Sequence, residues 1–213
     1  MRRALHLMVA LILTLSIASH AEAQEPKKAQ FAELLSRARE ADPGLDFTAL
    51  RMAYAESDLY SPYGGDRSVF EKALREKDYA EAIRLGEERL KEDFLDVWAH
   101  WAVWQAANEL GDQKRMDLHV YMLRGILQSI RDSGDGKSTE TAFKVISTAE
   151  TYFVLTVMGY RPKSQALQGK DGHSFDAMTV VDSESGAEVT LFFNVDISMN
   201  HMKRLLSPAK KPS

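Results

Sequence analysis

Apolar residues in the first half of the chain recur every three or four positions, which is the spacing of one helix face. A first helix is predicted from Phe31 to Ala38, and the Asp-Pro-Gly turn at 42–44 stops it. Asp46 is a good N-cap for a second helix that continues through Tyr54. Residues 31–54 are therefore predicted to form two short helices.

Two pairs of helices follow, and they repeat at a fixed distance. The predicted helices cover residues 68–76, 79–90, 97–110 and 116–130. The turns at Lys77-Asp78 and Gly111-Asp112 lie 34 residues apart, and Phe70 matches Trp104 at the same offset. Helix–turn–helix units of this period are typical of tetratricopeptide (TPR) repeats.

The segment from Tyr63 to Ile130 resembles the TPR family, most closely at Asp78-Tyr79 and Ala82. It departs from the family pattern at Gln113 and Met116, where a tyrosine and an alanine are usual. The alternative interpretation is an ordinary set of antiparallel helical pairs without the TPR stack.

The hydrophobic pattern changes near the C-terminus. Ser138 is predicted to cap a long helix over residues 138–158, which Gly159 ends. Strands at 174–182 and 188–195 form a predicted hairpin, residues 163–167 are the candidate for a third strand, and a short helix covers 198–206. The predicted fold is mainly α (α+β): TPR-like antiparallel helical hairpins followed by a small C-terminal antiparallel β-hairpin or sheet. Residues 24–195 form one predicted domain, and 196–213 a short helix and a polar tail.

The first 23 residues have the pattern of an export signal. A basic start, Met1–Arg3, precedes the apolar run Ala4–Ala18, and small residues stand at Ala21 and Ala23. These are the three parts of a signal peptide. The run is short for a bilayer span, which needs about 20 residues, so an uncleaved anchor is the less favoured alternative. Cleavage after Ala23 predicts a periplasmic or secreted protein.

Composition sharpens this prediction. The chain has 213 residues, 27 Lys and Arg, 31 Asp and Glu, and a net charge of −4. Without residues 1–23 the counts are 25 and 30, a net charge of −5. An acidic surface argues against nucleic acid as a partner. Because the chain has no cysteine, a protein exported to an oxidising compartment would depend on packing alone.

Several short sequence motifs together resemble those of an exported bacterial family known as domain of unknown function number 4919. They are spread from Leu45 to Val195, and their order and spacing carry the resemblance; they include Asp46-Phe47, Leu50-Arg51, Tyr54, Ser57, Tyr60, Pro62-Tyr63, Ser133–Gly136, Ser138, Ala142-Phe143, Val145-Ile146, Glu150 and Phe192–Val195. The resemblance implies an exported protein of a Gram-negative bacterium, and it implies no activity.

One candidate binding surface follows from the tryptophans at 98, 101 and 104, which lie within an arc of about 120° on a helix. In the 34-residue register, the stripe that faces a TPR groove consists of Trp98, Trp101, Gln105 and Asn108, with Arg67 and Glu71 in the preceding unit. Aromatic and amide side chains suit the capture of a peptide. The competing interpretation, which is commoner for such stripes, places these tryptophans in the core.

A second candidate is a polar cluster, Asp132, Asp135, His173 and Asp176, near the junction of the predicted long helix and the hairpin. It motivates the alternative function, an envelope enzyme or small-ligand-binding protein with a site between helix 138–158 and the hairpin. The favoured function is a non-enzymatic module that binds a protein or peptide in the cell envelope.

No cofactor and no metal are predicted. The sequence Gly136-Lys137-Ser138 lacks the first glycine and the preceding strand of a phosphate-binding loop. Arg131 and Ala142 occupy the first and last ligand positions of a calcium loop, where neither can bind calcium. The histidines at 100, 119, 173 and 201 follow no zinc-binding spacing.

Overall fold

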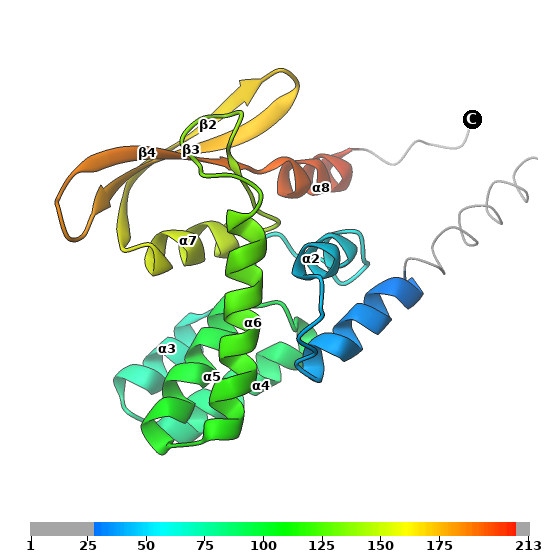
Figure 1. The fold of residues 1–213 in the computed structure, drawn as a ribbon, viewed down its shortest axis with the longest axis vertical. Helices are drawn as coiled ribbons and strands as arrows, with labels where there is room; N and C mark the ends of the chain where they lie inside the picture. Colours follow the sequence, from blue (N-terminus) through cyan, green and yellow to red (C-terminus); the bar gives the residue numbers. More distant parts are fainter. Residues whose placement is uncertain (1–27, 208–213) are drawn as a thin grey trace, which may run out of the picture.

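The computed structural model describes residues 28–207, so the predicted signal peptide and most of the polar tail lie outside the described residues. Residues 28–39 are helical. The elements that follow are α2 (Phe47–Ala55), α3 (Ser68–Arg75), α4 (Tyr79–Glu92), α5 (Val97–Leu110), α6 (Gln113–Arg131), β1 (Phe143–Lys144), α7 (Thr148–Val157), β2 (Tyr160–Lys170), β3 (His173–Asp182), β4 (Glu188–Asn194) and α8 (Asp196–Leu206). The predicted mainly α (α+β) class is confirmed (Figure 1).

The two predicted helical pairs, α3–α4 and α5–α6, lie side by side and are joined by tight turns (Figure 1). Asp78, Asp96 and Asp112 cap α4, α5 and α6 through side-chain acceptors for backbone N–H groups. Gly111 ends α5 in the left-handed conformation at φ 70°, which glycine adopts without a steric penalty. Local sequence chemistry therefore sets the bounds of these helices.

The C-terminal sheet has the strand order β1-β4-β3-β2. The predicted hairpin is β3–β4, and the predicted third strand is the longer β2, antiparallel to β3. The sheet is mixed because β1 pairs in parallel with β4, with Phe143 opposite Phe193. The sequence pattern predicts antiparallel pairing only, so the parallel β1–β4 pair differs from that prediction.

The predicted long helix over residues 138–158 is wrong. Its first part is a loop followed by β1, and only α7 is helical, capped by Ser147 rather than Ser138. Phe143 and Ile146 have helical spacing, but Phe143 packs on Phe193 with ring centroids 5.5 Å apart. Tertiary packing against β4 therefore overrides the local helical pattern.

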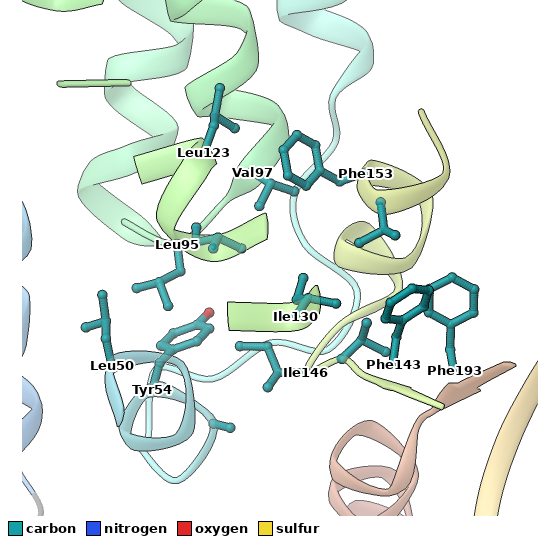
Figure 2. Packing of buried hydrophobic residues seen from close by; sticks show 14 of the residues in the cluster. Leu50, Tyr54, Leu95, Val97, Leu123, Ile130, Phe143, Ile146, Phe153 and Phe193 are labelled. Carbon is teal, nitrogen blue, oxygen red and sulfur yellow. The ribbon is translucent and has the colours of Figure 1, made fainter. Parts of the chain in front are cut away.

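One large core joins the helices to the sheet. Leu50 and Tyr54 of α2 lie near Leu95 and Ile146, and the core continues to Phe143 and Phe193 (Figure 2). α7 lies between the helical pairs and the sheet (Figure 1), and its Phe153 is buried in this core.

An ion pair is buried within this hydrophobic core. Arg51 of α2 is 1% exposed and Glu150 of α7 is 3% exposed. Arg51 donates two hydrogen bonds to Glu150, from Nε to Oε1 at 2.8 Å and from Nη2 to Oε2 at 2.6 Å. It also donates to Ser129 Oγ of α6 at 3.0 Å and to the Lys144 carbonyl of β1 at 2.9 Å. The pair and its hydrogen bonds thus join four elements, α2, α6, α7 and β1.

We expect Glu150→Gln to lower the free energy of unfolding by about 3–5 kcal/mol, because it leaves the guanidinium of Arg51 buried without a counter-charge. Urea unfolding of the mature protein measures this loss. The exposed pair Lys72–Glu76 at the C-terminal end of α3 supplies the control, since Glu76→Gln should change stability by less than about 0.5 kcal/mol. Equal effects of the two substitutions would contradict the structural role of the buried pair.

Candidate functional site

The tryptophans of α5 are shared between the core and the surface. Trp98 and Trp101 meet Phe153 of α7 with ring centroids 6.1 and 6.2 Å apart, both edge to face. The guanidinium of Arg67 lies 4.8 Å from the centre of the Trp98 ring. Trp98, Trp101 and Trp104 are each only partly buried. These rings therefore pack against the core and keep part of their surface exposed, and the binding role of the stripe stays a prediction.

The rest of the predicted stripe lies beside them. Arg67 Nε bonds Glu71 Oε1 at 3.1 Å, which joins the start of α3 to Trp98. Gln105 and Asn108 line a shallow cavity of about 280 Å³, whose other lining residues are Leu74, Tyr79, Trp104 and Glu109. We call Arg67, Glu71, Trp98, Trp101, Trp104, Gln105 and Asn108 the α5 face. Leu74, Tyr79 and Glu109 were not predicted, because helical spacing does not show which neighbouring helix completes the hollow.

The four residues of the predicted polar cluster each have a different partner. Asp132 accepts from Gln128 at 2.6 Å, and Asp135 accepts from the Thr141 hydroxyl at 2.6 Å. Asp176 accepts from Gln165 at 2.7 Å, whereas His173 Nδ1 lies 2.6 Å from Asp196 Oδ2. Because His173 and Asp176 are three positions apart on β3, they belong to opposite faces of the sheet. The geometry gives these four residues no common reaction centre.

His173 nevertheless lines a cavity of about 390 Å³ at the end of the sheet. The other lining residues are Ser133, Thr139, Glu140, Ala142, Lys144, Lys170, Asp171, Phe175 and Asn194. Most of one wall comes from the segment 133–142, which the sequence analysis placed partly in a helix. That error hid the cavity.

A buried histidine pair connects α5 and α6. His100 is fully buried and His119 is 3% exposed, with their Nδ1 atoms 2.7 Å apart. His100 Nε2 lies 2.8 Å from the Phe94 carbonyl, which can only accept, so Nε2 carries the proton and Nδ1 accepts from His119. The two histidines are 19 positions apart on different helices, and no short motif reveals the pair.

Burial lowers the pKa of His100 to about 3, assisted by the neighbouring His119. Burial also lowers the pKa of His119 to about 4, while the charge of Glu87 raises it and that of Arg115 lowers it. Both rings are therefore neutral in the folded protein at pH 7.

Residues 28–207 contain neither a cluster of metal ligands nor a membrane-spanning helix. No group of three or more histidine, aspartate or glutamate side chains in this range is placed to hold a metal ion. No helix in this range is long and apolar enough to cross a membrane.

The fold defines a class of protein with two helical hairpins packed through one further helix, α7, onto a small mixed sheet. The family described as Domain of unknown function (DUF4919) matches residues 19–204, and the chain belongs to this family. No curated protein and no solved structure matches the chain. The likeness of the helical pairs to TPR repeats stays a prediction.

We expect the protein to lose stability as the pH falls from 7 to 5. An unfolded histidine has a pKa near 6.5, whereas the folded pair stays neutral, so the unfolded state binds more protons below pH 6.5. The loss is about 2 kcal/mol per histidine by pH 5. Urea unfolding at several pH values measures the slope.

His119→Gln removes one titrating group and keeps an amide that can donate to His100. The slope should become shallower, while folding at pH 8 shows that the variant is intact. A slope equal to that of the unmodified protein would show that His119 is not the group that resists protonation.

Proposed function

We propose that the protein is exported to the cell envelope and there binds a protein or peptide segment through the α5 face. The observation that carries this proposal is a row of partly exposed tryptophans with amide side chains beside it. Large aromatic side chains at a surface supply apolar contact area, and amides supply both donors and acceptors for a peptide backbone.

The tryptophan rings are held in place by neighbouring side chains, which favours binding. Phe153 holds Trp98 and Trp101 from the core side, and Arg67 stacks on Trp98. Side chains that are already fixed lose less conformational freedom when a partner binds. The hollow beside Gln105 and Asn108 gives a partner side chain a place next to the aromatic row.

The envelope-enzyme alternative has less geometric support. Its four polar residues are held by separate partners. A binding module needs no such convergence, so it is the function that this arrangement favours.

Selection of peptides from a displayed library on purified residues 24–213 tests the proposal. The double variant Gln105→Ala, Asn108→Ala should weaken the selected peptides about tenfold or more. Its stability should change little, because Asn108 is exposed and Gln105 is half-buried. Gln113→Ala, an exposed amide on α6, is the matched control.

Two outcomes oppose the assignment. Peptides that bind the double variant as well as the unmodified protein would place the binding surface elsewhere. A loss of about 3–5 kcal/mol on Trp98→Ala, as for a fully buried aromatic, would identify that ring as core only.

Export has its own test. We expect the full chain, produced in a Gram-negative bacterium, to appear in the periplasmic or extracellular fraction with Gln24 as its first residue. Ala23→Arg should block cleavage, because signal peptidase needs a small residue at this position, whereas Glu22→Gln should leave cleavage intact. A full-length product in the cytoplasm would refute the predicted signal.

A further inference from the structure

The cavity beside His173 is built on one face of the sheet. The strand register puts Lys144, Asn194 and Phe175 in one row across β1, β4 and β3. Residues two apart on a strand share a face, so His173 lies on the same face as Phe175. All four residues line the cavity, and Phe175 is only 5% exposed. The sheet thus supplies an apolar floor with charged and polar groups around it.

The opposite wall is the loop between α6 and β1, which is held in one shape by its own hydrogen bonds. The Gly136 N–H donates to the Thr141 carbonyl at 2.8 Å, and the Lys144 N–H donates to Ser133 Oγ at 2.8 Å. A Cβ at Gly134 would lie 2.2 Å from the Thr141 carbonyl oxygen, so the loop closes tightly there. The cavity is therefore formed before any ligand arrives.

Two pairs of charged or titratable groups around the cavity are already satisfied. Lys170 at the end of β2 forms an ion pair with Glu140 and donates to Thr139 Oγ1 at 3.1 Å. Asp196 holds His173 through Nδ1, which leaves the Nε2 atom of that ring for a ligand. These contacts tie the β2–β3 turn to the loop and to α8.

Two charges of opposite sign remain. Neither the Lys144 ammonium nor the Asp171 carboxylate makes a hydrogen bond or an ion pair with any residue in the described range 28–207. Lys144 is on β1, and Asp171 is in the turn between β2 and β3, so two to three strand spacings, about 10–14 Å, separate their backbones. The hydrogen bond to Glu140 and, to a smaller extent, the charge of the adjacent Asp171 raise the pKa of Lys170, although Lys170 and Asp171 form no ion pair. A single cavity therefore offers, at separate places, a cation and an anion that have no hydrogen-bonded partner.

We propose that this cavity binds a small zwitterion, a free amino acid or a dipeptide. Its carboxylate contacts Lys144, its ammonium contacts Asp171, and its apolar part lies over Phe175. The volume of about 390 Å³ falls within the usual range of small-molecule sites, about 300–1,000 Å³. A simple anion would be repelled by Asp171 and a simple cation by Lys144. This site is separate from the α5 face, so either proposal can fail alone.

Glycyl-leucine is the probe, added to ¹⁵N-labelled residues 24–213 and followed by NMR and calorimetry. Resonances of residues 133–144 and 170–175 should shift. Lys144→Gln and Asp171→Asn should each weaken binding about tenfold, the effect of one lost charge-assisted contact. Both variants should fold, because Arg51 uses only the backbone carbonyl of Lys144, and asparagine tolerates the φ of 52° at Asp171.

The controls are Lys72→Gln and Glu76→Gln at the C-terminal end of α3, which remove the same charges away from the sheet (Figure 1). N-acetyl-glycyl-leucine and glycyl-leucine amide, each lacking one charge, should bind about tenfold more weakly.

Three results would overturn the proposal. No resonance shift at about 10 mM dipeptide, where a 1 mM site would be nearly saturated, excludes the ligand class. Equal binding by Lys144→Gln and the unmodified protein places the ligand elsewhere. The third result is competition by inorganic phosphate. If phosphate displaces the dipeptide and binds the Asp171→Asn variant at least as tightly as the unmodified protein, the cavity is a plain anion site.

Discussion

The buried pair Arg51–Glu150 is the interaction on which the arrangement of this protein depends. Its charges are almost fully removed from water, which is favourable only when every donor and acceptor is satisfied. Arg51 uses Nε, Nη1 and Nη2, and Glu150 Oε2 also accepts the Ile146 N–H at 2.8 Å. No buried side-chain nitrogen or oxygen in the described part of the chain lacks a partner. An apolar contact tolerates a small shift, but this network fixes α2, α6, β1 and α7 in one geometry.

The connection between helices and sheet follows from that geometry. Because Arg51 binds the Lys144 carbonyl, β1 is held where Phe143 can pack on Phe193. The Tyr60 hydroxyl donates to the Ile146 carbonyl and fixes the next stretch of chain. Residues 51, 60, 143, 146, 150 and 193 are among those that carry the resemblance to the family. In this structure they form the joint between the helical pairs and the sheet, so part of the resemblance to the family rests on residues that hold the fold together.

The helices were predictable wherever local chemistry decides the structure. Asp46 caps α2 as predicted, and α4 and α6 begin directly after the predicted turn residues Asp78 and Asp112. The change to alternating β-branched residues predicts β3 and β4. The helix prediction was wrong for residues 138–147. Their apolar spacing fits a helix, but contacts with β4 and Arg51 decide their structure. Those contacts join residues that are 50 and 93 positions apart, and the ion pair itself spans 99 positions. A single sequence shows no periodicity that reports such pairings.

The same distinction explains what could be foreseen of the candidate sites. The α5 face lies on one helix and its neighbour, so helical spacing identified most of it, including Trp98 and Asn108. The cavity at the sheet draws Lys144, Asp171 and His173 from β1, from the turn between β2 and β3, and from β3, so only His173 was found. Both surfaces adjoin elements that the buried pair positions: Phe153 supports the tryptophans, and β1 carries Lys144. A substitution of Arg51 or Glu150 that breaks this ion pair would therefore disturb both surfaces at once. Only side chains outside that network, such as Gln105, Asn108, Lys144 and Asp171, can separate binding from folding.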